Sequence, residues 1–96
     1  MFVVITFTGC GKTQLEKAQS KIVSIGEQFL DYELTIDEAK EQLESIVVPP
    51  KEKNAIWNLD NDKSHLEYLI LKSRNNSTVI DEIEGTIQNI KKRKYE

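Results

Sequence analysis

The chain has 96 residues, a formal net charge of −3 and 30% charged side chains. This length predicts a single domain, residues 1–96, whose small core leaves a narrow margin of stability. The single cysteine, Cys10, excludes a disulfide within the chain and favours a reducing, cytoplasmic location. No apolar run approaches the roughly 20 residues that a membrane-spanning helix needs, so no membrane association is expected.

The first predicted element is a strand over residues 2–7, Phe-Val-Val-Ile-Thr-Phe. Its residues are β-branched or aromatic and do not alternate with polar ones, which is typical of a strand covered on both faces. Gly9 and Gly11 end this strand.

Two helices follow, over residues 14–31 and 36–46, and each begins with a capping box. Thr13 and Thr35 are each followed three residues later by a glutamate that caps in return. In both segments apolar residues recur every three or four positions, as expected for one buried stripe. The short linker predicts that the two helices form a hairpin, and Pro49-Pro50 ends the second one.

Residues 51–76 are predicted as two strands, over 55–59 and 66–71, around a turn at Asp60–Ser64. The aromatic and isoleucine residues of the flanking runs favour strands, and the Asp-Asn-Asp-Lys-Ser sequence favours a turn. A helix over residues 63–73 is the alternative, since the Lys, Leu, Glu and Tyr residues there tolerate a helix well.

The last predicted element is a helix over residues 77–93 with Ser77 as its N-cap. Acidic residues early and basic residues late suit the helix dipole, and Gly85 faces away from the apolar stripe. The element order β-α-α-β-β-α predicts an α+β fold. We expect a small sheet of about three strands with helices packed mainly on one face.

A glycine-rich loop at residues 8–13 resembles the end of a nucleotide-binding P-loop. Gly11-Lys12-Thr13 has the required order, but Thr6 stands where the first glycine of the motif belongs, so the loop is too short to encircle a phosphate chain. The glycines then serve a tight turn. The alternative is a small-ligand or anion site built from exposed N–H groups at Gly9, Cys10, Gly11, Lys12 and Thr13.

No catalytic or metal site is complete in the sequence. Cys10 is the only thiol and His65 the only imidazole, so neither a thiolate nucleophile with a neighbouring base nor a zinc site is indicated. Asp60 opens an EF-hand-like run, but His65 and Leu71 stand where glycine and glutamate are required. We therefore expect neither an enzyme nor a cofactor.

Two surfaces remain as candidates for macromolecular partners. Aromatic and isoleucine side chains favour a protein partner or a second copy of the chain, namely Trp57, Tyr68, Ile80, Ile83, Ile87 and Ile90. The basic C-terminal segment favours nucleic acid, through Lys91, Lys92, Arg93 and Lys94. Segment 69–92 resembles a helix-turn-helix, but acidic residues at the start of its second helix would repel phosphate.

The sequence therefore predicts a small non-enzymatic protein-interaction module, a regulator or inhibitor that acts by contact and is able to form homo-oligomers. The alternatives are a small-ligand or phosphate-binding module centred on residues 9–13, and a nucleic-acid-binding protein that uses the basic tail. The excess of Lys over Arg and the abundance of Ile and Asn are typical of AT-rich coding sequences, as in low-GC bacteria and their phages.

Overall fold

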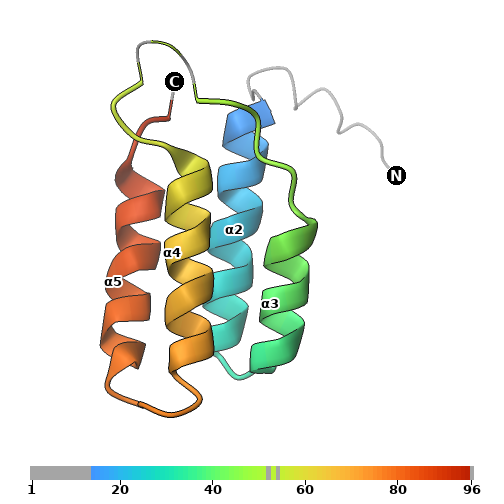
Figure 1. The fold of residues 1–96 in the computed structure, drawn as a ribbon, viewed down its shortest axis with the longest axis vertical. Helices are drawn as coiled ribbons and strands as arrows, with labels where there is room; N and C mark the ends of the chain where they lie inside the picture. Colours follow the sequence, from blue (N-terminus) through green and yellow to red (C-terminus); the bar gives the residue numbers. More distant parts are fainter. Residues whose placement is uncertain (1–13, 52, 54, 96) are drawn as a thin grey trace.

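The computed structural model describes residues 14–51, 53 and 55–95. Successive helices run antiparallel, so that α2 and α4 begin at the end of the molecule where α3 and α5 finish (Figure 1). Helices α2 and α4 each pack against both α3 and α5, which makes an up-and-down four-helix bundle. The described residues contain no strand and four helices: α2 Gln14–Leu30, α3 Ile36–Ser45, α4 Leu59–Lys72 and α5 Val79–Lys92.

The predicted α+β fold is wrong for the part of the chain that the structure describes. The strand predicted over residues 2–7 lies outside the described residues. The strands predicted over 55–59 and 66–71 are absent, and the predicted turn at Asp60–Ser64 forms the first turns of α4. The alternative, a helix over residues 63–73, has the right type, and α4 begins four residues earlier.

Helix α4 forms because its first turn is capped and its apolar residues share one face. Asn58 Oδ1 accepts hydrogen bonds from the backbone N–H groups of Asp60 and Asn61, at 3.0 and 3.4 Å. These bonds satisfy donors that have no partner inside the helix. Acidic side chains in the first turn also suit the positive end of the helix dipole. The same Asp and Asn residues that favour turns therefore start a helix here.

The other three predicted helices are confirmed: two begin at the predicted residue, and the remaining ends differ by one or two residues. The capping box of α3 is present: Thr35 Oγ1 accepts from the N–H of Glu38 at 3.1 Å, and Glu38 Oε1 accepts from the N–H of Thr35 at 2.9 Å. Thr13, the other predicted cap, lies outside the described residues. The predicted N-cap Ser77 is wrong: the N-cap of α5 is Thr78, and the helix begins at Val79.

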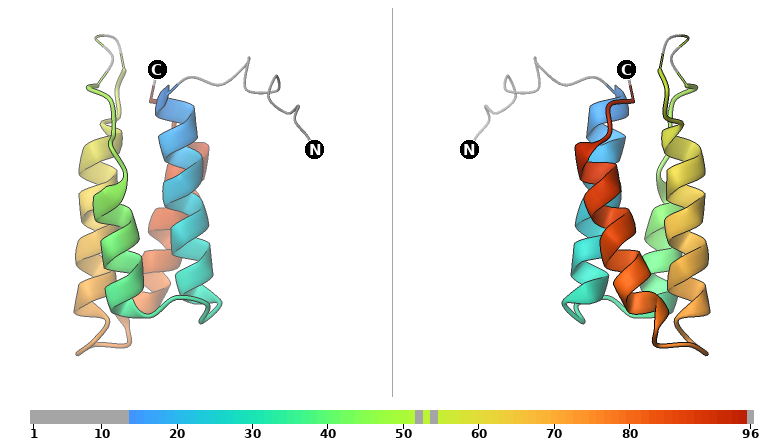
Figure 2. Two further views of the ribbon diagram at one scale, coloured as in Figure 1. Left: turned by 90° about the vertical axis from the view of Figure 1, so that its right-hand side faces the viewer. Right: turned by 90° about the vertical axis from the view of Figure 1, so that its left-hand side faces the viewer.

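The four helices share one apolar core, to which each contributes a single stripe. Figure 2 shows the bundle edge-on as two layers, with α2 and α5 in one and α3 and α4 in the other. The side chains between the layers exclude water almost completely. The largest fully buried ones include Ile22 of α2, Leu43 of α3, Leu66 of α4, and Ile83 and Ile87 of α5.

Gly26 sets how closely α2 approaches α5. A Cβ atom at this position would lie 2.7 Å from Cδ1 and 2.8 Å from Cγ1 of Ile87, closer than van der Waals contact permits. Gly85 of α5 differs, since a Cβ there would have no neighbour within 4 Å. The two glycines therefore lower helix stability to the same extent, but the space for a side chain is occupied by Ile87 at Gly26 and open at Gly85.

The two glycines give a matched pair of variants. Gly85→Ala should raise the free energy of unfolding by about 0.5–1 kcal/mol through helix propensity alone. Gly26→Ala gains the same propensity but overpacks against Ile87, which costs about 1–3 kcal/mol, so a net loss is expected. Urea denaturation followed by circular dichroism measures both. Equal stabilisation by the two substitutions would contradict the close helix contact.

Candidate functional site

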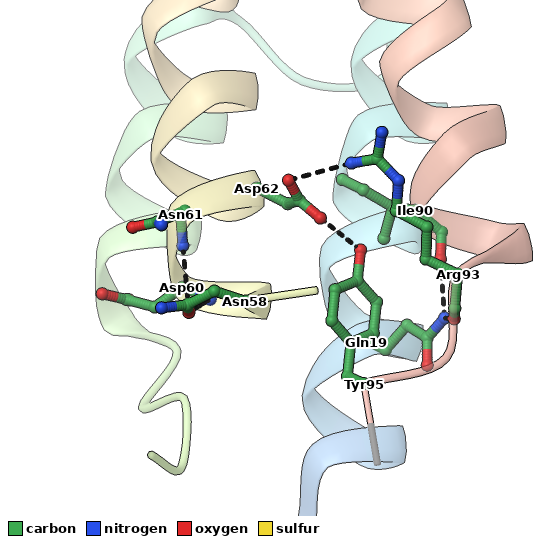
Figure 3. A network of polar contacts seen from close by, with 8 residues as sticks. All are labelled: Gln19, Asn58, Asp60, Asn61, Asp62, Ile90, Arg93 and Tyr95. Atoms are coloured by element: carbon green, nitrogen blue, oxygen red, sulfur yellow. Dashed lines mark hydrogen bonds and ion pairs between the residues drawn. The ribbon is translucent and has the colours of Figure 1, made fainter. Parts of the chain in front are cut away.

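At the end of the bundle where α5 finishes, the C-terminal segment is tied to α4 through Asp62. One carboxylate oxygen of Asp62 accepts from Arg93 Nη1 at 3.0 Å and the other accepts from the Tyr95 hydroxyl at 2.6 Å (Figure 3). The guanidinium carbon of Arg93 also lies 3.9 Å from the ring centroid of Trp57, a cation–π contact. We call these four residues the C-terminal cluster.

Tyr95 is the buried member of the C-terminal cluster, with 2% of its surface exposed. Burial and the hydrogen bond to Asp62 raise the pKa of Tyr95, so the phenol stays protonated and donates at neutral pH. Both oxygens of Asp62 are already used by donors within the chain. The cluster is therefore arranged to hold the C-terminal segment in place.

Side chains from neighbouring helices also cap the helices that finish at this end. Gln19 of α2 donates from Nε2 to the carbonyl oxygens of Ile90 and Arg93, at 2.6 and 3.1 Å (Figure 3). Lys63 of α4 donates from Nζ to the carbonyl oxygens of Leu43 and Ile46, both at 3.1 Å. Carbonyl groups in and just after the last turns of α3 and α5 thus accept hydrogen bonds from an adjacent helix.

A pair of carboxylates, Glu44 of α3 and Glu67 of α4, bridges two helices. The hydrogen bond from Lys40 lowers the pKa of Glu44, and Lys40 Nζ lies 3.2 Å from its carboxylate. Burial, followed by the hydrogen bond to Glu44, raises the pKa of Glu67. Two carboxylates with opposite pKa shifts can share a proton. Because Glu44 is exposed to solvent, we interpret the pair as an inter-helix contact at the surface.

The opposite end of the bundle has an apolar surface. A hollow of about 240 Å³ lies between the α2–α3 turn and the first turn of α5, and six of its seven lining residues are apolar. We call this hollow the apolar recess. Ile80 is 38% exposed there and Tyr32 is 95% exposed. The apolar lining residues are Phe29, Leu30, Tyr32, Leu34, Ile36 and Ile80.

Tyr32 has an unusual backbone conformation. Its φ of 64° lies in the left-handed region, and no other non-glycine residue of the described part of the chain has a positive φ. The N–H groups of Tyr32 and Glu33 donate to the carbonyls of Phe29 and Gln28, at 3.1 and 2.8 Å. This is a Schellman motif, which most often has glycine at the left-handed position. A large side chain is held in solvent at a position where glycine would be easier to accommodate.

The apolar recess adjoins an acidic hollow. A second hollow, of about 360 Å³, shares Leu30 with the recess and is lined by Glu27, Asp31 and Glu84 among others. Residues 27–38 contain five acidic side chains and no basic one. Glu27 forms an ion pair with Lys91 at 2.6 Å. Asp31 and Glu84 have no ion-pair partner within the described part of the chain.

The structure separates the residues that the sequence grouped as a protein-binding surface. Trp57 is 41% exposed and belongs to the C-terminal cluster, whereas Tyr68 is 56% exposed on α4 with Lys72 Nζ 5.7 Å from its ring centroid. Of the isoleucine stripe, Ile80 alone is exposed. The other three serve the core, with at most 1% exposure: Ile83, Ile87 and Ile90.

The proposed nucleic-acid surface is similarly divided. Lys91 and Arg93 form ion pairs within the chain, with Glu27 and Asp62, while Lys92 and Lys94 are exposed.

The candidate anion site lies wholly outside the described residues: Gly9, Cys10, Gly11, Lys12 and Thr13. The sequence did not predict the roles of Tyr32, exposed at one end of the bundle, or of Asp62, which holds the C-terminal segment at the other. Each was only part of a predicted linker or turn.

The structure offers little for other kinds of site. Among residues 14–51, 53 and 55–95, no group of three or more His, Cys, Asp or Glu side chains is placed to hold a metal ion. A hollow of about 600 Å³ between α2 and α3 has a mixed lining that includes Lys17, Lys21 and Gln42. No helix in the described part of the chain has the length and apolarity to cross a bilayer.

Comparisons with known proteins add no relative. No protein-family model matches this chain, and neither the curated proteins nor the solved structures gave a match.

The C-terminal cluster predicts a specific cost for losing Asp62. Asp62→Ala leaves Arg93 and the Tyr95 hydroxyl without their acceptor, which should lower the free energy of unfolding by about 2 kcal/mol. The control is Asp60→Ala, an exposed acidic residue of the same helical turn, for which a loss of about 0.5 kcal/mol is expected. Chemical denaturation of both variants measures the difference. Similar losses would show that the cluster does not hold the C-terminal segment.

The carboxylate pair predicts a dependence on pH. Because the folded-state pKa of Glu67 is raised above its ordinary value of 4.5, its ionisation opposes folding, and stability falls as the pH rises through 4.5 to the raised pKa. Glu44 acts in the opposite sense, and its contribution is lost as the pH falls through its lowered folded-state pKa. Glu67→Gln should therefore be more stable than the natural protein at pH 7, with a smaller difference at acidic pH.

Denaturation curves across this pH range measure the effect, with Glu41→Gln on the exposed face of α3 as the control. A Glu67→Gln variant that is less stable than the natural protein at pH 7 would contradict the direction of the shift.

Proposed function

We propose that this protein is a non-enzymatic interaction module, a regulator or inhibitor that binds another protein through the apolar recess. The observation that carries this proposal is Tyr32, a large aromatic side chain that is 95% exposed in a left-handed backbone conformation. That conformation costs a non-glycine residue about 1–2 kcal/mol. Strained residues tend to cluster at functional sites, and an exposed tyrosine supplies a large contact area with few rotatable bonds.

The size of the recess favours a protein partner over a small molecule. Its volume of about 240 Å³ lies below the roughly 300–1,000 Å³ of ordinary ligand pockets. Such a hollow accommodates one or two apolar side chains. With Tyr32 and Ile80 exposed beside it, the same end of the bundle offers both a hollow and projecting side chains, as the central part of a protein interface does.

Site-specific photo-crosslinking tests the proposal. A photoreactive phenylalanine analogue replaces Tyr32 in one variant and Tyr68, the exposed aromatic residue of α4, in the control. After illumination in the source cells, a covalent adduct with one defined protein is expected at position 32 and not at position 68. Mass spectrometry identifies the adduct. If position 32 gives no more adduct than position 68 in equally stable variants, the recess is not a binding surface.

A further inference from the structure

We infer that the segment bound at the apolar recess is a basic amphipathic helix, with apolar side chains for the recess and a neighbouring Lys or Arg for the acidic hollow. This inference rests on the function proposed above and adds the chemistry of the partner. It follows from the arrangement of the two hollows, which meet at Leu30. One offers apolar contacts, and the other offers the carboxylates of Asp31 and Glu84.

Asp31 is the most informative of these charges. It directly follows the C-terminus of α2, so its carboxylate lies at the negative end of the helix dipole. The last turn of α2 contains no basic residue that would offset this charge. A basic residue would be favourable at this position, and an acidic one opposes the dipole. Other acidic residues of this end have roles within the chain: Glu38 caps α3 and Asp37 pairs with Arg74 at 2.8 Å. The charge of Asp31 is therefore available to a cation from outside.

An amphipathic helix matches two hollows that adjoin each other. Residues three or four positions apart on a helix have Cβ atoms about 5–6 Å apart, so an apolar anchor and a cation can enter neighbouring hollows from one segment. The wider rim is also acidic, with Glu33 in the α2–α3 turn and Asp81 and Glu82 in the first turn of α5. Complementary charge of this kind speeds association and selects the partner.

A second copy of this chain is a less suitable occupant. Exposed Lys92 and Lys94 lie at the end of the bundle where α5 finishes (Figure 1). The exposed basic residues where α4 finishes already have contacts within the chain, since Lys72 Nζ lies 5.7 Å from the ring centroid of Tyr68 and Arg74 pairs with Asp37. Contact between unlike ends of identical molecules builds open filaments unless the rotation between copies closes a ring. Light scattering distinguishes this case, because filament growth depends on protein concentration.

Three synthetic helical peptides test the inference with the whole chain. The probe has leucine and phenylalanine at helical spacing flanked by lysine and arginine. One control replaces the basic residues with glutamate, and the other replaces the apolar residues with serine. In nuclear magnetic resonance titrations, the probe should shift the amide signals of residues 29–36 and 80–84. Both controls should bind about tenfold more weakly or worse, since each lacks half of the complementarity.

Protein variants supply the reciprocal test. Asp31→Lys with Glu84→Lys should weaken binding of the basic peptide about tenfold or more by charge reversal. The lysine at position 31 suits the helix dipole and Glu84 is exposed, so both changes should leave the fold intact, which a circular dichroism spectrum of the variant checks. Tyr32→Asn, which tolerates the left-handed conformation, should also weaken binding. Glu41→Lys, a charge reversal on the exposed face of α3, serves as the control and should leave binding unchanged.

Equal binding of the acidic peptide, no binding of the basic probe, or shifts confined to other residues would each overturn the inference. Self-association that the double lysine variant abolishes would also overturn it, in favour of a second copy. If crosslinking at position 32 captures a protein while the basic probe fails to bind, the proposed function stands and the partner has a different chemistry. If both experiments fail, the interaction function fails as well.

Discussion

Burial of the isoleucine stripe of α5 against α2 and α4 is the contact on which the bundle depends. Ile83, Ile87 and Ile90 are almost completely buried, and α5 packs against both of these helices. Each buried aliphatic side chain contributes about 1.5–3 kcal/mol of transfer free energy. Ile87 lies close to the backbone of α2 because position 26 has no side chain. Since α2 and α5 lie far apart in the sequence, their contact closes the bundle.

The two ends of the bundle differ in how far their polar and apolar groups are paired within the chain. At the end where α3 and α5 finish, Gln19, Lys63 and Asp62 bind the free carbonyl groups and the C-terminal segment. The hydrogen-bonding groups of this end thus have their partners within the chain. At the opposite end the α2–α3 turn leaves Tyr32 in solvent over an apolar recess, beside carboxylates without an ion-pair partner in the described part of the chain. That asymmetry is why the functional proposal is placed at the α2–α3 end.

Helix periodicity predicted α2, α3 and α5, and the capping box predicted the start of α3, because these signals depend on residues close together in the sequence. They failed for α4, where Asp60–Ser64 suit a turn and a first helical turn equally well, and where Leu66–Leu71 contain good helix formers beside Tyr and Ile. Ile80 is exposed and its predicted role at a partner surface stays a prediction, whereas three isoleucines of its stripe are in the core. The recess itself was not predictable, because it joins the α2–α3 turn to a helix more than 40 residues away.

The distribution of charge along the bundle has a consequence for diffusion. Residues 27–38 contain five carboxylates and no basic side chain, although Glu27 pairs with Lys91 and Asp37 with Arg74, and residues 91–94 contain four cations at the end where α5 finishes (Figure 1). The molecule thus has an electric moment roughly parallel to its helices. In the field of a charged surface within about a Debye length, near 8 Å at physiological ionic strength, that moment exerts a torque. Such a moment favours approach with one end of the bundle foremost, and added salt weakens this preference.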